Sequence, residues 1–202
     1  GNICRSPMAE FVFKDIVKKQ GLEKEFYIKS SATSSEEIGN DIHYGTRDKL
    51  IQNGIPFTKR KAVKLRTEDY KKYDYIISNP PFFEDDLKSA DKTKNNAKHD
   101  TSLSLLELLQ VVDNHLATAG IFAVLLPYHR VDYFIEESKK RGLYLATQVL
   151  VKHTIKHKFF RGILFFNREE TKPELSEIII KDIEHKYTPE FAAALKDYYL
   201  FL

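Results

Sequence analysis

The chain has 202 residues, which is enough for one domain, or for one large domain and part of a second. Hydrophobic residues make up 42% and charged residues 30%, as in an ordinary globular protein, and no apolar run approaches the roughly 18 residues of a membrane-spanning helix. The single cysteine, Cys4, excludes an internal disulfide bond and predicts a reducing, cytoplasmic location. A net charge of +3 permits binding to a polyanion without requiring it.

Hydrophobic spacing and turn residues divide the chain into alternating helices and strands. The expected elements, in chain order, are a helix opened by Pro7, capped by Ser6 and stopped at Gly21, a short strand 26–31, a helix 41–53 with Tyr44, Leu50 and Ile51 as apolar contacts, a short helix 67–72, a buried strand 73–77, a polar loop 88–99, a helix 102–117 ended by Gly120, a strand 121–126, a helix 131–141, strands 144–154, 159–166 and 178–181, and a final helix 189–201. This order predicts an α/β fold with a three-layer, Rossmann-like, mostly parallel sheet and antiparallel C-terminal strands.

The first residues form a motif that can bind an anion. They read Gly1-Asn2-Ile3-Cys4-Arg5-Ser6-Pro7-Met8-Ala9-Glu10 and place a loop at the start of the first helix. Backbone N–H groups and the positive end of the helix dipole favour an anion there, and the guanidinium of Arg5 matches phosphate oxygens. Asn2, Arg5 and Ser6 are therefore the candidate phosphate-binding residues.

The same motif resembles the phosphate loop of low-molecular-weight protein tyrosine phosphatases. The likeness continues through Ser30-Ser31-Ala32 and Asn53-Gly54-Ile55 to the strand 73–77, so we assign residues 1–77 to a phosphatase-like segment. The family's nucleophilic cysteine would lie before Gly1, Cys4 matches its second cysteine, and no Asp-Pro segment supplies its general acid. We therefore expect an anion-binding helix start without phosphatase catalysis, and we expect residues upstream of Gly1 to be missing.

A second motif, Ser78-Asn79-Pro80-Pro81-Phe82-Phe83, directly follows the strand 73–77. Its two prolines stiffen the loop. The side-chain oxygen of Asn79 and the carbonyl of Pro80 can then accept hydrogen bonds from an exocyclic amino group. Phe82 or Phe83 offers a ring on which a flipped-out base can stack. The motif predicts an acceptor site for methyl transfer to an amine.

The order of elements around this motif resembles bacterial tRNA-valine adenine-N6 methyltransferases. The likeness spans residues 73–202, and we assign 78–202 to the C-terminal part of a methyltransferase domain. Its further segments are Ala97-Lys98-His99-Asp100, Leu125-Leu126-Pro127, His157-Lys158-Phe159-Phe160-Arg161-Gly162 and 187–202. The resemblance implies S-adenosylmethionine as the methyl donor, tRNA as the substrate, and Asn79, Pro80, Pro81 and Phe82 as the catalytic residues that hold the target adenine.

Two features decide which parts of that activity we expect. No Gly-x-Gly pair occurs among the eight glycines, so the glycine-rich loop that holds the donor in this family is missing. A basic, aromatic segment follows the strand 144–154 and can contact tRNA phosphates, although a solvated hairpin with core aromatics explains it equally well. Its candidate nucleic-acid-binding residues are Lys152, Lys156, Lys158 and Arg161.

The seven histidines show no metal-ligand spacing, so we expect no metal site.

We interpret the chain as a chimera of two α/β proteins that are joined in the strand 73–77. Three functions stay open. The first is an adenine-N6 methyltransferase for tRNA, which can be inactive without its donor loop. The second is a remnant of a low-molecular-weight phosphatase, and the third is a non-catalytic RNA-binding α/β domain.

Overall fold

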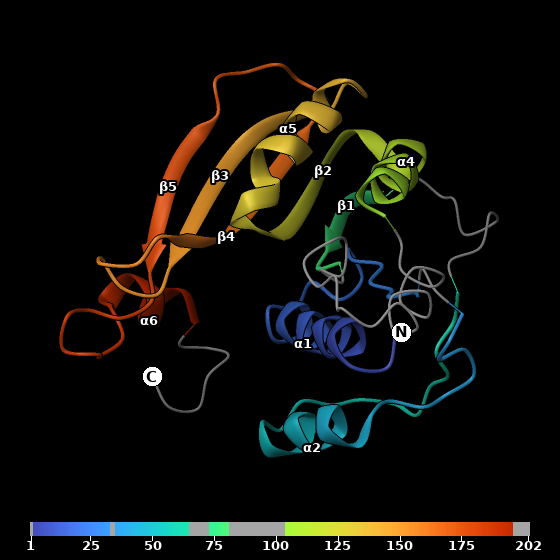
Figure 1. The fold of residues 1–202 in the computed structure, drawn as a ribbon. Coiled ribbons are helices and arrows are strands. Elements are labelled where there is room, and N and C mark those ends of the chain that lie inside the picture. Colours follow the sequence, from blue (N-terminus) through green and yellow to red (C-terminus); the bar gives the residue numbers. More distant parts are fainter. Residues whose placement is uncertain (1, 33–34, 65–72, 81–103, 196–202) are drawn as a thin grey trace, which may run out of the picture. The chain divides into compact units, whose positions relative to one another are not determined.

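The computed structural model describes residues 2–32, 35–64, 73–80 and 104–195 (Figure 1). These residues divide into two compact units, of which the first holds the described residues up to 64 and the second those from 73 onward. The predicted helix 67–72, the predicted loop 88–99, Pro81, Phe82 and the end of the last helix lie outside the described residues. None of the described helices combines the length and the apolar composition that crossing a bilayer requires.

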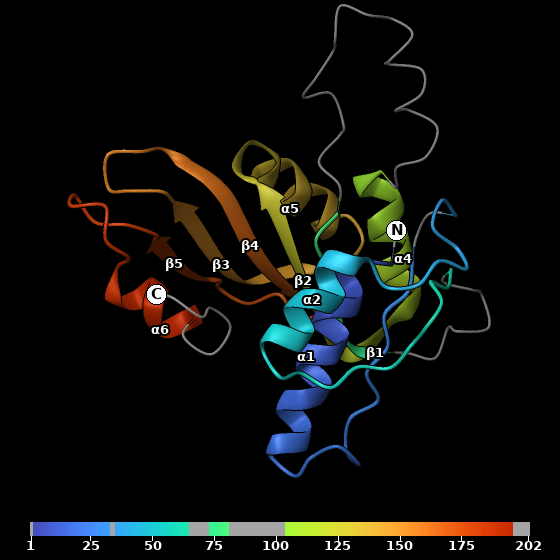
Figure 2. The same cartoon turned by 90° about the horizontal axis from the view of Figure 1, so that it is seen from below.

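The first unit is built on two helices that pack against each other (Figures 1 and 2). Helix α1 spans Arg5–Lys19 and helix α2 spans Tyr44–Gln52. Phe11, Ile42 and Leu50 form their shared apolar centre, and Phe57 lies edge-on to Phe11 with ring centroids 6.2 Å apart. Gly21 and Gly54, with φ of +71° and +63°, follow the two helix ends, as expected for residues that stop a helix in the left-handed conformation.

Two predictions for α1 and the segment that follows it are wrong. Ser6 does not cap α1, because the helix begins at Arg5 and the cap position, Cys4, makes no side-chain bond. The expected strand 26–31 is irregular: the backbone N–H of Ser30 donates to the carboxylate of Glu10, and the only described bridge nearby joins Ala32 to Lys64. A strand requires a continuous ladder with a partner, which this segment lacks among the described residues.

Helix α2 starts three residues later than predicted. The carboxylate of Asp41 accepts the backbone N–H of Ile42, and the ring of His43 accepts the N–H of Gly45, so His43 is the N-cap. Of the three predicted apolar contacts, Leu50 is buried, whereas Tyr44 and Ile51 are 67% and 61% exposed. The helical period predicts that all three face the core, but the only side chains of α2 that are buried are Thr46 and Leu50.

The second unit is a five-stranded sheet with helices packed on one face. The strands lie in the order β1-β2-β4-β3-β5. They are β1 (Tyr73–Ser78), β2 (Leu116–Pro127), β3 (Tyr144–Lys152), β4 (Phe159–Asn167) and β5 (Glu174–Ile179). The pairs β1–β2 and β3–β5 are parallel, and β4 runs antiparallel to both of its neighbours. Four strands therefore point the same way. The predicted α/β, Rossmann-like sheet, mostly parallel with an antiparallel finish, is confirmed.

Helices α4 (Leu105–His115) and α5 (Val131–Lys139) bury their apolar sides against β2 and β4. The 3-10 helix η2 (Tyr128–Arg130) joins β2 to α5, and the short helix α6 (Pro189–Leu195) follows β5. Ser104 caps α4 in a capping box with Glu107, which satisfies backbone N–H groups at both ends of the box. Phe122, Phe134 and Phe166 meet at the centre of this core with ring centroids 5.8–6.2 Å apart.

Three predictions for this unit need correction. The last strand, predicted at 178–181, spans Glu174–Ile179. Gly120 does not end a helix: it lies inside β2, which begins at Leu116 directly after α4. Strand β1 is not fully buried, since Tyr75 is 63% and Ile77 77% exposed. Both belong to one face of β1, and β1 is an outer strand of the described sheet, so only its other face is packed.

Candidate functional site

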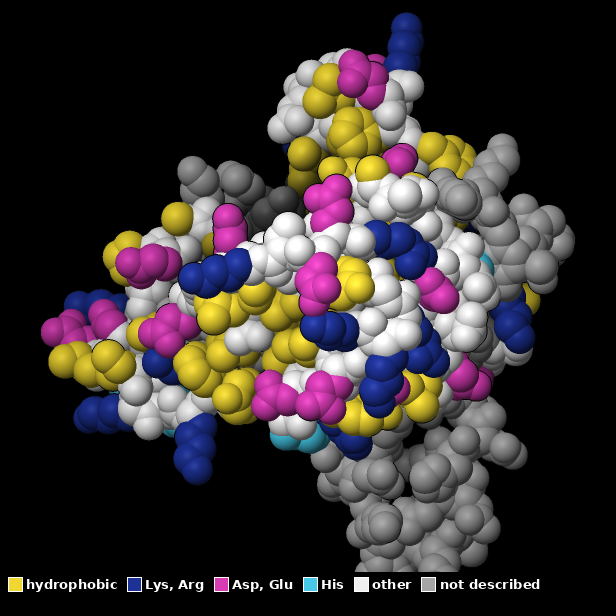
Figure 3. All heavy atoms as spheres, turned by 90° about the horizontal axis from the view of Figure 1, so that it is seen from above, with side chains coloured by type: hydrophobic (Ala, Val, Ile, Leu, Met, Phe, Trp, Pro, Cys, Tyr) yellow, Lys and Arg dark blue, Asp and Glu magenta, His cyan; other side chains and the backbone are white. Residues whose placement is uncertain are grey.

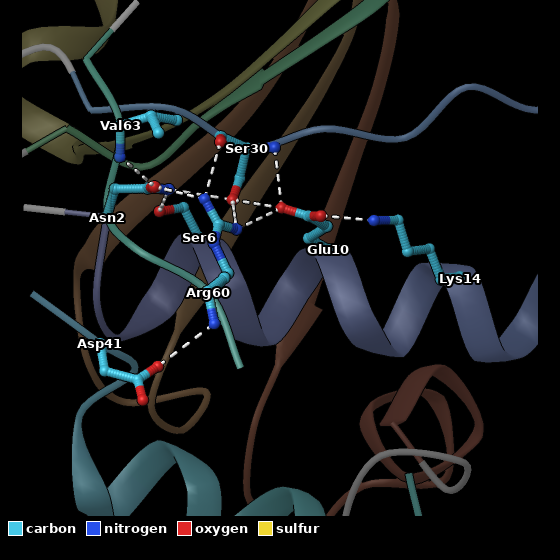
Figure 4. Close-up of polar contacts among 8 residues, drawn as sticks. All are labelled: Asn2, Ser6, Glu10, Lys14, Ser30, Asp41, Arg60 and Val63. Atoms are coloured by element: carbon cyan, nitrogen blue, oxygen red, sulfur yellow. Dashed lines mark hydrogen bonds and ion pairs between the residues drawn. The ribbon is translucent and has the colours of Figure 1, made fainter. Parts of the chain in front are cut away.

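The start of α1 is organised by a polar network around Asn2 (Figure 4). Asn2 has a φ of 72°, a left-handed conformation that asparagine adopts more readily than most residues. Its amide nitrogen donates to Ser6 Oγ at 3.0 Å and to Ser30 Oγ at 2.9 Å. Its amide oxygen accepts from Arg60 Nη2 at 2.6 Å and from the backbone N–H of Val63 at 3.4 Å. The side chain of Asn2 is thus fully used in holding the loop.

Arg60 and Glu10 form the charged centre of this network. The Glu10 carboxylate is 9% exposed and accepts from Ser30, from Arg60 and from Lys14 (Figure 4). Burial by itself raises the pKa of Glu10, but the hydrogen bonds from Lys14 and Ser30 and the charge of Arg60 outweigh it, so the pKa lies below its usual value. A buried, paired carboxylate of this kind fixes structure and has no free lone pair directed at a ligand.

Of the three predicted phosphate-binding residues, the structure brings Asn2 and Ser6 together and leaves Arg5 exposed. Asn2 and Ser6 bond to each other, so they shape the loop, whereas Arg5 has no ion pair among the described residues and can meet an anion from solvent. The sequence did not reveal Arg60, because it lies 58 positions from Asn2 in an irregular segment without a motif. The phosphate-binding role of Asn2, Arg5 and Ser6 stays a prediction.

The second candidate site lies at one edge of the sheet in the second unit. Because four strands share one direction, the carboxyl ends of β1, β2, β3 and β5 and the amino end of β4 lie along the same edge, which we call the carboxyl edge. Asn79 and Pro80 follow β1, Tyr128 follows β2, Lys152 ends β3, and Phe159 begins β4. The topology therefore aligns the acceptor motif with the basic segment.

At this edge Asn79 is exposed and Pro80 is buried. The proline can anchor the loop while the amide of Asn79 stays open to solvent, as an acceptor site requires. Ser78 is level with Val124 and Pro127 with Arg161, so Asn79 lies four residues short of the level of Phe159, or about 13 Å along the strands, in addition to about 10 Å across two strands. Pro81 and Phe82 lie outside the described residues, and the catalytic roles of all four residues stay predictions.

Tyr128 is a further ring at the carboxyl edge that sequence reasoning missed. It is 42% exposed and packs against Phe159, with ring centroids 5.5 Å apart. It follows Pro127, whose place after a buried strand was the available signal. Tyr128 begins the strand-to-helix connection beside that of Asn79, because β1 and β2 are adjacent and parallel.

The four predicted nucleic-acid-binding residues have different surroundings. Lys152 is 14% exposed, pairs with Glu177 at 3.1 Å and lies over the ring of Phe159 at 4.8 Å, so its charge is already engaged. Lys156 and Lys158 are exposed in the loop between β3 and β4. Arg161 is half-buried, donates to the carbonyl of Phe160 and lies 5.4 Å from the ring of that residue. Their contact with nucleic acid stays a prediction.

Charges are distributed differently on other parts of the surface. On the face shown in Figure 3, lysine and arginine side chains lie interspersed with aspartate and glutamate side chains. In contrast, residues 138–168 contain eight lysines or arginines and no acidic residue. Of these eight, Lys152, Lys156, Lys158 and Arg161 lie at the carboxyl edge or in the loop between β3 and β4, whereas Lys139, Lys140, Arg141 and Arg168 lie at the opposite edge of the sheet. Because Lys152 is paired with Glu177, the exposed positive charge of this loop comes from Lys156 and Lys158.

The described residues do not fit a methyl donor of the nucleoside type. Such a donor needs a glycine-rich loop that leads from a strand into a helix. Gly21, Gly39, Gly54 and Gly142 have positive φ in turns or after helices, Gly45 lies in the first turn of α2, and Gly120 and Gly162 lie inside strands. None of these seven described glycines forms a strand-to-helix loop. Nor do the described residues gather three His, Cys, Asp or Glu side chains that could hold a metal ion.

Comparisons with known proteins give two different relatives. Residues 1–100 match the family described as low molecular weight phosphotyrosine protein phosphatase. The tRNA1(Val) (adenine(37)-N6)-methyltransferase of Flavobacterium johnsoniae is 34% identical over 134 residues, which cover 66% of this chain and 57% of the relative. The enzyme of the same name from Bacteroides fragilis strain YCH46 is 34% identical over 131 residues, covering 64% and 54%. The chain thus spans a little over half the length of these relatives.

Two solved structures also align with the chain, each with a TM-score below 0.5. A predicted O-methyltransferase from Agrobacterium tumefaciens aligns with 92% of this chain and 70% of its own, at 10% identity and a TM-score of 0.48. A low molecular weight protein tyrosine phosphatase from Streptococcus pyogenes aligns with 70% and 80%, at 27% identity and a TM-score of 0.40. The phosphatase match extends past residue 77 to residue 100, and the boundary at 77/78 stays a prediction. The chain therefore combines an N-terminal part that resembles low molecular weight phosphotyrosine protein phosphatases with a part that resembles bacterial tRNA1(Val) (adenine(37)-N6)-methyltransferases.

Proposed function

We propose that the second unit is the acceptor-side part of an adenine-N6 methyltransferase that acts on tRNA in the cytoplasm. The observation that carries this proposal is the carboxyl edge, on which the exposed amide of Asn79, Tyr128 and the basic loop between β3 and β4 all lie. The similarity to tRNA1(Val) (adenine(37)-N6)-methyltransferases supports the same substrate class.

The proposed chemistry depends on the hydrogen-bond acceptors of the loop that begins at Asn79. The amide oxygen of Asn79 and the carbonyl of Pro80 accept the two N–H bonds of an exocyclic adenine amine. These bonds fix the rotation of the amine, so that its lone pair points toward the incoming methyl group. Positioning of this kind lowers the barrier without a general base. Pro81 stiffens the loop, and Phe82 supplies a ring against the flipped-out base.

S-adenosylmethionine is the donor that the resemblance implies, and it would supply the methyl group on a sulfonium. The described residues lack a loop for it, so we derive no transfer step from this structure. The proposal therefore separates into two measurable parts. The first is tRNA binding at the carboxyl edge, and the second is methyl transfer, which needs donor binding as well.

Three measurements on the full chain test these parts. Filter binding measures affinity for a tRNA1(Val) transcript, calorimetry measures affinity for S-adenosylmethionine, and incorporation of labelled methyl groups measures transfer. We expect tRNA binding with strong salt dependence, because phosphates supply most of the affinity. If donor binding and transfer are also found, Asn79→Ala should abolish transfer while tRNA binding changes less than about threefold. Asn53→Ala, which alters an exposed amide after α2, is the matched control.

The outcomes distinguish the alternatives that the sequence left open. Binding of tRNA without binding of S-adenosylmethionine would identify a non-catalytic RNA-binding domain. Transfer that persists in Asn79→Ala would refute the acceptor role of that residue. Absence of any salt-dependent tRNA binding would refute the proposed function altogether.

A second candidate function has its own supporting observation in the first unit. The left-handed Asn2 and its hydrogen bonds hold the start of α1 in a defined loop beside the exposed Arg5, and the phosphatase family match includes these residues. Cys4, the only cysteine of the chain, is adjacent to Arg5, not five residues before it. We propose anion binding without turnover. An aryl phosphate hydrolysed at a rate that falls in Arg5→Ala would overturn this view.

A further inference from the structure

The loop between β3 and β4 contains two histidines to which the acceptor chemistry gives no role. His153 follows the end of β3, and His157 precedes the start of β4. Both are exposed, and their ring centroids are 6.0 Å apart at an interplanar angle of 77°. Two exposed rings that stand nearly perpendicular to each other form a corner with one flat wall and one edge.

One face of the His153 ring is packed against a second aromatic side chain. The ring of His153 stacks on the ring of Phe160, with centroids 4.0 Å apart and planes within 8° of parallel. Arg161 lies 5.4 Å from the same phenyl ring. Phe160 therefore has neighbours on its ring, and the exposed surface that this stack offers to a ligand belongs to His153.

The loop that carries the two histidines is held in place by backbone and side-chain bonds. The carbonyl of His153 accepts the N–H of Lys181 at 2.9 Å, and the carbonyl of Thr154 accepts the N–H of His157 at 3.0 Å. Thr154 is buried, and its Oγ1 lies 2.7 Å from Nδ1 of His157. This bond leaves Nε2 as the ring nitrogen of His157 that can bond to a ligand.

The charge around the corner favours a polyanion over a free neutral ring compound. Lys156 and Lys158 are exposed in the same loop, and no acidic residue occurs between Ser138 and Arg168. The carboxylate that approaches from β5, Glu177, is paired with Lys152. A ligand with a flat aromatic group and flanking negative charges matches this arrangement, and a nucleotide within single-stranded RNA has both.

We infer that His153, supported by Phe160, is the stacking platform for one unpaired base of the RNA, with His157 at the edge of that base and Lys156 and Lys158 on the neighbouring phosphates. The inference rests on the proposed RNA-binding function and assigns it a base-binding subsite distinct from the Asn79 loop. Across the sheet, β3 is three strands from β1, or about 14 Å, so the platform would hold a base other than the one presented at Asn79.

The test compares His153→Ala with His153→Phe, using fluorescence anisotropy of a labelled 12-nucleotide oligoadenylate and of an abasic strand of equal charge. Loss of one base–ring stack weakens binding by roughly 5- to 100-fold. We expect that loss for His153→Ala on oligoadenylate, no change on the abasic strand, and near wild-type affinity for His153→Phe. Ile155→Ala, which trims an exposed side chain of the same loop, is the matched control and should change neither probe.

The results separate this inference from the function on which it rests. If the wild-type chain fails to bind tRNA, the proposed function fails. If tRNA binds and Lys158→Glu weakens it, but His153→Ala binds both probes like the wild type, the function stands and the platform is refuted. If His153→Phe is as weak as His153→Ala, the imidazole acts by hydrogen bonding or charge, and stacking is again refuted. Circular dichroism of each variant checks that the sheet is intact.

Discussion

Replacing Arg60 by alanine should destabilise the first unit more than any surface change in it. Arg60 donates to the carboxylate of Glu10, to the hydroxyl and carbonyl of Ser30 and to the amide oxygen of Asn2. Its side chain is 15% and that of Glu10 is 9% exposed, so solvent screens the pair only weakly. Removing one partner of a buried ion pair costs about 3–5 kcal/mol. Lys14 and Ser30 still bond to Glu10 in the variant, which reduces the expected loss to about 2–3 kcal/mol, below that range.

The assay is hydrogen exchange of the backbone amides of α1, with those of α5 in the other unit as an internal reference. A loss of about 2–3 kcal/mol corresponds to roughly 30- to 150-fold faster exchange of the slowest α1 amides. Lys14→Ala is the matched control: the Lys14 ammonium bonds to the same carboxylate but is 46% exposed, and an exposed pair contributes about 0–1 kcal/mol. Equal exchange rates in the two variants would show that burial does not set the strength of this pair.

The same variant should also respond differently to acid. In the folded chain the pKa of Glu10 is lowered by the hydrogen bonds of Lys14 and Ser30 and by the charge of Arg60, despite the opposing effect of burial. The unfolded chain therefore takes up a proton first as the pH falls. The resulting stability is fully present above the unfolded pKa of about 4.3 and is lost as the pH falls toward the folded value. Arg60→Ala should show a smaller loss over this range, and an unchanged acid profile would contradict the argument.

Three further outcomes are expected for the second unit. Leu109→Ala, at a fully buried position of α4, should lower the free energy of unfolding by about 2–5 kcal/mol in urea titrations, whereas Leu106→Ala at a 40% exposed position should cost less than about 1 kcal/mol. Gly162→Ala should cost about 1–3 kcal/mol in the same assay, because the added Cβ would lie 2.6 Å from a methyl group of Val131. Burial lowers the pKa of His115, so stability should fall as the pH drops below the unfolded pKa of about 6.5, and His115→Gln should flatten that part of the stability–pH curve.

Repeating patterns in the sequence predicted the parts of the fold that depend on local periodicity. The leucines of α4 recur every three or four residues, and Gly142 is a local stop signal after α5, whereas the cap at Ser104 was missed because the helix was predicted to begin at residue 102. The strand order was not accessible in this way. Placing β4 between β2 and β3 depends on pairings such as Val124 with Leu164 and Val149 with Ile163, which no local pattern specifies.

Prediction of the candidate sites from the sequence was limited in the same way as prediction of the strand order. The sequence named Asn79 because a stiff proline turn after an apolar strand has a specific chemical use. It could not reveal Arg60, which joins Asn2 and Glu10 across 58 and 50 positions. In the basic segment, Phe160 is stacked on His153 and Phe159 packs against Tyr128 at a tilt of 44°, and neither contact follows from a local pattern. Exposure of a ring depends on its tertiary neighbours, which composition alone does not report.

The architecture of the second unit determines which strands hold the proposed acceptor loop in place. Its apolar centre is formed by α4, α5, β2 and β4, all of which lie after residue 104, and Ile76 of β1, which belongs to the phosphatase-like segment, packs against this centre. Strand β1 joins that core through one ladder with β2 and through one packed face. The loops after β2 and β3 are therefore positioned by strands of the C-terminal part, whereas the Asn79 loop is positioned by β1, which the phosphatase-like segment includes. The proposed recognition of base and phosphates and the binding of a donor would use different loops, so tRNA affinity and methyl transfer have to be measured separately.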